Sequence, residues 1–127
     1  MELVRTGYDA WNRSDLDGIL GMLAPDLEFV TSGLFPGLDP VYGGHDGFKK
    51  FWRDFRGTWQ SLQVIINELR DSDERVVALL TFEARGRDGL EVRRQAGSVH
   101  TLRDGLVTRI ENYEGWAEAL EAAGLSE

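Results

Sequence analysis

The second half of the chain is divided by short polar turns into segments in which β-branched and aromatic residues alternate with polar ones. Such alternation is typical of strands with one buried and one solvated face. The four segments are Leu62–Leu69, Arg75–Arg85, Leu90–Arg103 and Leu106–Tyr113. Because a parallel connection needs about a dozen residues of crossover, turns this short join antiparallel neighbours. We therefore predict an antiparallel meander.

The beginning of the chain has a helical pattern instead. Leu3, Val4, Tyr8 and Trp11 recur at helical spacing, and the polar run 12–15 interrupts them. The same polar residues offer caps for a second helix. We therefore predict two short helices that meet at a corner.

The second helix is predicted over Leu16–Leu23. We expect Pro25 to end it, because proline lacks a backbone N–H and disfavours a helical residue before it. A first strand is predicted over Leu27–Thr31. The next stretch, 32–40, combines prolines and glycines with large apolar residues, so we expect a loop that folds over a cavity.

A third helix is predicted to begin after Gly43-Gly44-His45-Asp46 and to run to about Phe55. Its aromatic side chains lie on one side at helical spacing. A last helix is predicted over Trp116–Ala123, with Gly124 as its stop. Helices followed by strands, with no linker or repeat, predict a single α+β domain over residues 1–127.

The charge of the chain excludes some partners. It carries 14 basic and 22 acidic residues, a formal charge of −8, with no basic cluster that could follow a phosphate backbone. No stretch approaches the roughly 20 apolar residues of a membrane span, and the start lacks a signal-peptide pattern. Without cysteines, disulfides are excluded. We expect a cytoplasmic protein that binds neither nucleic acid nor a membrane.

Four short motifs occur in order along the chain. They are Trp11–Asp17, Tyr42–Gly47, Leu102–Tyr113 and Glu118–Leu125. Together they resemble the SnoaL-like branch of the nuclear transport factor 2 (NTF2)-like, or cystatin-like, superfamily, which is related to polyketide cyclases and ketosteroid isomerases. The resemblance implies a curved antiparallel sheet that forms a cone-shaped half-barrel closed by helices, and a homodimer through the outer sheet face. It leaves the activity open, because this fold hosts several enzyme classes and non-catalytic members.

The resemblance also implies where catalytic groups would lie. Ketosteroid isomerases use a carboxylate base, a tyrosine and a protonated carboxylic acid. The matching positions here are Thr31, Gly7 and Ser98, so steroid isomerase chemistry is not expected. Tyr8 is a poor substitute for the tyrosine, because one residue turns a helical side chain by about 100 degrees. Gly115 stands where the family often has an aspartate, which weakens a cyclase assignment.

His100 is the candidate proton carrier. Alternation places it on the inner strand face, and imidazole accepts and donates protons near neutral pH. Its orienting partner would be Asn112, Glu114 or Glu83, and the sequence does not choose among them. The alternative is a structural histidine that bonds a neighbouring strand.

Other residues are predicted to line a pocket for an apolar ligand, although a simple aromatic core is the alternative for the large rings. The predicted ligand-binding residues are Trp11, Phe29, Thr31, Phe35, Trp52, Phe55, Phe82, Ser98, Asn112 and Glu114. Phe35 and Leu38 would form a lid. His45 and Asp46 are predicted to cap the aromatic helix. Because only two histidines occur, without a paired-ligand spacing, we expect no metal and no cofactor.

These residues support two hypotheses of different class. The first is a small-molecule-binding domain that acts on an apolar cyclic carbonyl compound, as a cofactor-independent isomerase, cyclase or dehydratase that uses His100. The second is a non-catalytic domain of the same fold that mediates dimerisation or partner binding.

Overall fold

The computed structural model describes residues 2–31, 37–57 and 59–125. The helices are α1 (Glu2–Asn12), α2 (Leu16–Leu20), α3 (Gly44–Arg56) and α4 (Trp116–Ala122). The strands are β1 (Leu23–Val30), β2 (Val41–Gly43), β3 (Trp59–Ser72), β4 (Arg75–Gly86), β5 (Glu91–Arg103) and β6 (Leu106–Tyr113). The predicted α+β class is confirmed.

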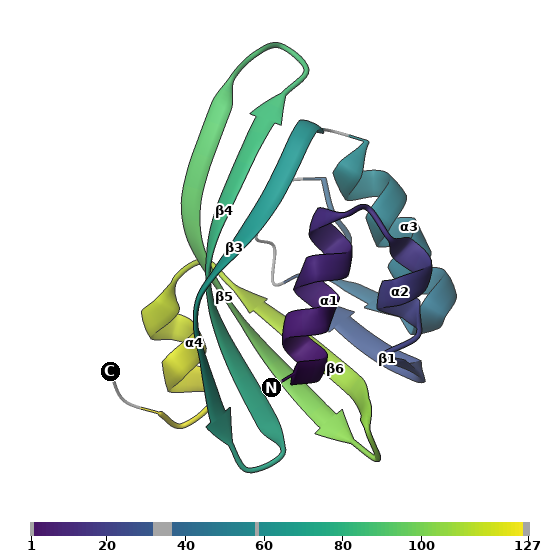
Figure 1. Cartoon of the computed structure of the whole chain (residues 1–127), viewed down its shortest axis with the longest axis vertical. Helices are drawn as coiled ribbons and strands as arrows, with labels where there is room; N and C mark the ends of the chain where they lie inside the picture. Colours follow the sequence, from purple (N-terminus) through teal and green to yellow (C-terminus); the bar gives the residue numbers. More distant parts are fainter. Residues whose placement is uncertain (1, 32–36, 58, 126–127) are drawn as a thin grey trace.

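The strands form one six-stranded sheet in the order β2-β1-β6-β5-β4-β3. Strands β3 to β6 pair antiparallel in sequence order, as their short turns predict. Strand β1 departs from the prediction, because it pairs with β6 in parallel. The chain between them is long enough for the crossover that parallel neighbours need. The sheet is therefore mixed, and it is curved and unclosed (Figure 1).

Two local predictions near β1 are wrong. The second helix ends at Leu20, and Pro25 lies inside β1 rather than terminating a helix. The proline is tolerated because the pairing of β1 with β6 shifts register between Leu23 and Glu28, so its missing N–H falls at an irregularity of the ladder. The short edge strand β2, which pairs with β1, was not predicted.

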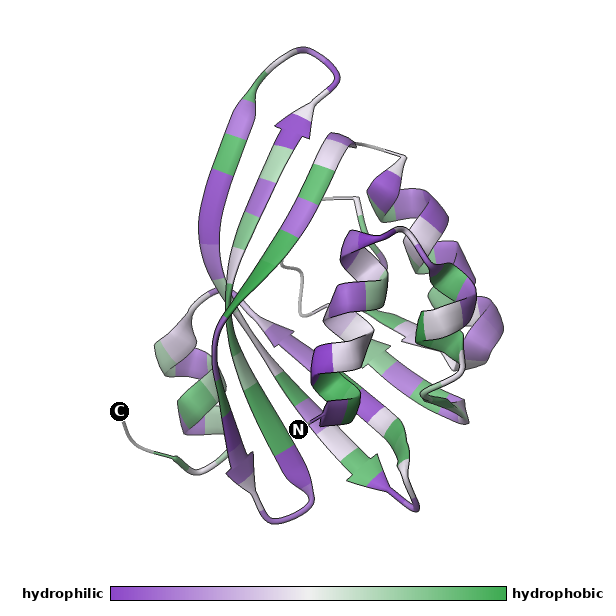
Figure 2. Cartoon of the chain, in the orientation of Figure 1, coloured by the Kyte–Doolittle hydropathy of each residue, from purple (hydrophilic) through white to green (hydrophobic). Residues whose placement is uncertain are grey.

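The helices lie on both faces of the sheet. Helices α1, α2 and α3 cover one face, which we call the inner face, and α4 packs on the opposite, outer face (Figure 1). Hydrophobic and hydrophilic bands alternate along the hairpin of β4 and β5 (Figure 2), as expected for strands whose two faces differ. No helix among the described residues is long and apolar enough to cross a membrane.

The inner core is dominated by aromatic rings from α3 and β1. Phe48, Phe51 and Phe55 are buried on one side of α3, as their spacing predicts. The Phe51 ring lies 4.3 Å from that of Phe29 and stacks at 5.3 Å on that of Phe55, measured between centroids. This aromatic wall fixes α3 at a distance from the sheet, because rings are large and rigid.

Helix α1 is tied to the free edge of the sheet by one side chain. The Asn12 amide donates from Nδ2 to Val64 O at 2.8 Å and accepts from Val64 N at Oδ1 at 2.9 Å. Because β3 is an edge strand, these two bonds replace part of a missing neighbour. They also set the position from which α1 presents its inner face.

Candidate functional site

A cavity of about 130 Å³ lies between the inner sheet face and helices α1, α2 and α3. Most of its lining is aliphatic or aromatic, and no Asp, Glu, Lys or Arg contributes to it among the described residues. A dry engineered cavity of about 150 Å³ accommodates benzene. The cavity therefore has room for about one small ring.

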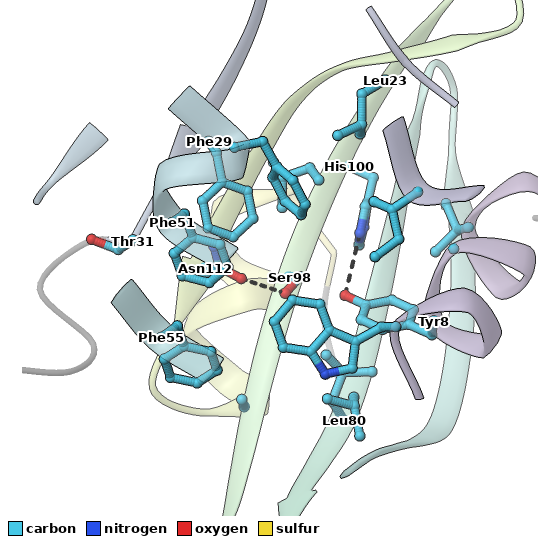
Figure 3. A pocket seen from close by; sticks show the side chains of 18 of the residues that line it. Tyr8, Leu23, Phe29, Thr31, Phe51, Phe55, Leu80, Ser98, His100 and Asn112 are labelled. Atoms are coloured by element: carbon cyan, nitrogen blue, oxygen red, sulfur yellow. Dashed lines mark hydrogen bonds between the residues drawn. The ribbon is translucent and has the colours of Figure 1, made fainter. Parts of the chain in front are cut away.

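Four polar side chains form a row on the cavity wall, which we call the polar row. They are Tyr8, Ser98, His100 and Asn112. Ser98 and His100 are two residues apart on β5, so they share its inner face. Asn112 is the direct neighbour of Ser98 on β6. Tyr8 reaches the row from α1, across the cavity from the sheet (Figure 3).

The first half of the row is the pair formed by Tyr8 and His100. The Tyr8 hydroxyl lies 3.3 Å from His100 Nε2, and His100 Nδ1 lies 3.3 Å from Val76 O. A carbonyl oxygen only accepts hydrogen bonds, so Nδ1 carries the proton of the neutral ring. Nε2 is then the acceptor, and the Tyr8 hydroxyl donates to it.

Burial keeps both members of this pair neutral. It lowers the pKa of His100 to about 4, against a weaker opposing effect of the hydrogen bond to Val76 O. It also raises the pKa of Tyr8. At neutral pH the pair is therefore a phenol hydrogen bonded to a neutral imidazole.

The second half of the row joins β5, β6 and β1. Ser98 Oγ donates to Asn112 Oδ1 at 2.8 Å, and Asn112 Nδ2 donates to Val30 O at 2.8 Å. The assignment of the Asn112 amide follows from the carbonyl of Val30, which needs a donor. Ser98 is buried, so its only proton is committed to Asn112 (Figure 3).

Most of the sequence-predicted site residues meet around this cavity. Those that line it are Trp11, Phe29, Thr31, Phe55, Phe82, Ser98, His100 and Asn112, together with the predicted lid residue Leu38. That they bind a ligand stays a prediction. The Thr31 hydroxyl is already used, because it donates to Asp39 O at 2.7 Å.

The remaining predicted residues lie elsewhere. Trp52 packs edge-on against Trp11 outside the lining, and the Arg56 guanidinium lies 4.6 Å over its ring. Glu114 is exposed and is also outside the lining, because the alternation of β6 ends at Tyr113. Phe35 lies outside the described residues.

The partners expected for His100 differ from those found. Glu83 forms an ion pair with Arg93, and Asn112 is engaged by Ser98 and Val30. Tyr8, which was expected to be a poor substitute for the isomerase tyrosine, takes the place next to His100. The inner face of a helix is wider than the rotation between neighbouring residues, and both Gly7 and Tyr8 line the cavity. The helical spacing of Val4, Tyr8 and Trp11 already carried this signal.

The predicted cap of α3 is also not formed by its side chains. Gly43 is the N-cap, without a side-chain hydrogen bond. His45 Nε2 instead lies 2.8 Å from Leu23 O and ties α3 to β1. In the described part of the chain, no group of three or more His, Cys, Asp or Glu residues has a geometry that could hold a metal ion.

Residues 4–110 match the family described as the SnoaL-like domain. The chain belongs to this family. Among curated proteins, none matches it. An NTF2-like protein of unknown function from Burkholderia pseudomallei is 28% identical, with 95% of this chain and 94% of the other covered and a TM-score of 0.85.

Two further solved structures extend the comparison. TerC, co-crystallised with polyporic acid, is 26% identical, covers 97% of this chain and 96% of its own, and has a TM-score of 0.82. A candidate polyketide cyclase from Xanthomonas campestris is 23% identical, covers 96% and 94%, and has a TM-score of 0.75, which bears on the fold alone. The chain thus has the NTF2-like fold that these three proteins share.

Proposed function

We propose that this protein binds a small, neutral, mostly apolar ring compound in the inner cavity and transfers a proton on it through Tyr8 and His100. The observation that carries the proposal is the polar row on the wall of an otherwise apolar cavity. Pockets for small molecules combine an apolar lining with a few polar groups that orient the ligand. TerC, which was co-crystallised with polyporic acid, supports a small-molecule ligand for the shared fold.

The absence of charged side chains from the described lining defines the ligand further. An anion in such a cavity would lose its hydration without gaining a cation, which is strongly unfavourable. A neutral ring with an enolisable carbonyl group fits the lining better, because the hydroxyl of its enol form can face the polar row while its apolar edge faces the aromatic side chains of α3. An apolar cyclic carbonyl compound is therefore the proposed substrate class.

The pair of Tyr8 and His100 is suited to taking a proton from one atom of the ligand and returning it to another. A proton next to the ligand carbonyl would pass to Tyr8 Oη as the Tyr8 proton passes to His100 Nε2. The bonding electrons remain on the ligand as an enolate. Because burial lowers the pKa of His100 to about 4, the imidazolium readily returns its proton to Tyr8 Oη, as Tyr8 passes the abstracted proton to another ligand atom. An isomerisation fits this cycle.

A thermal-shift and native mass spectrometry screen tests the binding step. Single-ring ketones and phenols should stabilise the wild-type protein, and stabilisation by a ligand rises with its concentration relative to Kd. An Ala96→Leu variant, which places a larger side chain in the lining, is the matched control and should lose the response. A wild-type protein that responds to no ring compound would refute the proposal.

Turnover of a ligand found in this way tests the catalytic step. His100→Gln and Tyr8→Phe should each lower the rate about 100-fold, which is typical for loss of a general acid or base, while binding is retained. Unchanged turnover in both variants would remove the pair from the mechanism.

The homodimer through the outer sheet face also stays a proposal. Helix α4 covers the outer residues Val77, Leu79 and Val99, which leaves the side of β3 for a second copy. On that side Ile65 is 37% exposed. Sedimentation equilibrium of the wild type and of Ile65→Lys tests it, and a monomeric wild type would refute it.

A further inference from the structure

We infer that Tyr8 and Ser98 meet the ligand as hydrogen-bond acceptors, so that the cavity selects ring compounds with a hydroxyl group, as in a phenol or an enol. The inference rests on the proposed binding function and names the ligand class of the same site. It reverses the usual role of a tyrosine beside a carbonyl ligand, which is to donate. Each hydroxyl proton in the polar row already has an acceptor within the protein.

The Tyr8 proton is not available to a ligand. His100 Nδ1 faces Val76 O at 3.3 Å and must donate to it, so Nε2 is unprotonated. The only hydroxyl proton of Tyr8 satisfies that nitrogen, at an O···N distance of 3.3 Å. If this proton turned to the ligand, a buried imidazole nitrogen would lose its partner, which is costly. The lone pairs of Tyr8 Oη therefore remain for the ligand.

The Ser98 proton is committed in the same way. Asn112 Nδ2 donates to Val30 O, which turns Oδ1 toward Ser98, and Ser98 Oγ donates to it at 2.8 Å. Ser98 is only 2% exposed, so water does not offer its Oγ many alternative partners. Tyr8 Oη and Ser98 Oγ are neighbours, and both residues line the cavity, so their oxygens form one acceptor site for a donor on the ligand.

The inference is compatible with the proposed reaction. An enol is a tautomer of a cyclic ketone, and its hydroxyl is the donor that Tyr8 and Ser98 lack. Phenols have the same donor on a ring that does not tautomerise readily, so they are suitable as stable probes. Four single-ring probes separate these properties. p-Cresol carries a hydroxyl donor and 4-fluorotoluene carries no donor. Acetophenone carries a ketone, and 4-methylbenzoate carries an anionic carboxylate.

The first experiment uses NMR to determine which ring nitrogen of His100 carries the proton, and it needs no variant. In wild-type protein labelled with 15N-histidine, His100 should show a protonated Nδ1 and an unprotonated Nε2 at pH 7. The opposite tautomer would overturn the inference, because Nε2–H would then donate to Tyr8 and free the tyrosine proton for the ligand.

The second experiment changes the acceptor that holds the Tyr8 proton. In His100→Leu this acceptor is lost, so Tyr8 should donate to the ligand, and the affinity ratio of p-cresol to acetophenone should fall about tenfold. His100→Gln is the matched control, because its amide oxygen still accepts from Tyr8, and it should keep the wild-type ratio. Circular dichroism establishes that both variants are folded.

The outcomes separate this inference from the binding function. Three results together support the hydroxyl inference and the binding function. The wild type binds p-cresol, it does not bind 4-methylbenzoate, and the affinity ratio of p-cresol to acetophenone falls only in His100→Leu. Binding of all three neutral rings with a ratio that is the same in all three proteins overturns the hydroxyl inference and leaves the binding function intact. Failure of every ring probe to bind the wild type overturns the binding function and this inference with it.

Discussion

The two faces of the sheet are packed in different ways. On the outer face α4 approaches β5 so closely that a Cβ added at Gly97 would overlap Ala119 and lie 3.0 Å from Gly115 O. On the inner face the preceding residue, Ala96, borders a cavity. Small residues let one helix lie directly on the strands, whereas aromatic side chains hold α3 away from them. The cavity is thus a property of the inner face and not of loose packing throughout.

The largest expected effect on the free energy of unfolding comes from the inner face and appears at low pH. The inner face holds a buried His100 whose pKa is lowered to about 4, whereas an unfolded histidine titrates near 6.5. As pH falls from 7 to 4, the unfolded chain takes up a proton that the folded protein does not. The free energy of unfolding should therefore fall by on the order of 3 kcal/mol more in the wild type than in His100→Gln.

Urea denaturation at a series of pH values measures this effect. A His100→Gln variant that loses stability with falling pH as steeply as the wild type would show that the inner histidine is not the acid-sensitive group.

Adding one methyl group to the outer face should have the next largest effect. Gly97→Ala places a Cβ against Ala119, and overpacking of this kind costs about 2 kcal/mol. Gln95→Ala, at the exposed outer position two residues before it on β5, should change stability by less than about 0.5 kcal/mol. Chemical denaturation of both variants measures the difference, and equal stabilities would contradict close packing of α4.

Removing the Asn112 amide from the polar row should lower stability by an intermediate amount. Asn112→Ala leaves the buried Ser98 hydroxyl and Val30 O without their partner, at a cost of about 1.5 kcal/mol. Glu114→Ala is the control just after the end of β6, because Glu114 is exposed, and it should be nearly neutral. If thermal melts of the two variants coincide, the row does not tie β6 to β1.

The smallest effect on stability is expected where the cavity offers space. Ala96→Val adds two methyl groups to the inner face and should change the free energy of unfolding by less than about 1 kcal/mol, because the added atoms enter the cavity. Its affinity for single-ring ligands should fall about tenfold or more. A loss of stability as large as that of Gly97→Ala would mean that the two faces are packed alike.

Predictions from local pattern held for much of the fold. The meander of β3 to β6 follows from alternation and short turns, and the aromatic side of α3 from helical spacing. Errors occurred where a distant strand sets the local structure. Pro25 is part of a strand because β6, from the far end of the chain, pairs with β1.

In the candidate site, too, local features were predictable from the sequence and contacts between distant segments were not. The inner faces of β5 and β6, with Ser98, His100 and Asn112, were predictable because alternation is a local property of a strand. The partner of His100 was not, since Tyr8 is 92 residues away in the sequence and its distance depends on how α1 sits on the sheet.

The sequence by itself determined most helices and strands of this protein, the inner faces of β5 and β6, and the absence of a cysteine or a strongly basic cluster. Those properties depend on residue type and on spacing within a few residues. Only the tertiary structure decided that the aromatic residues surround a cavity and that the Tyr8 proton is held by His100. Both depend on the separation between a helix and a curved sheet, which is set jointly by contacts from the whole chain.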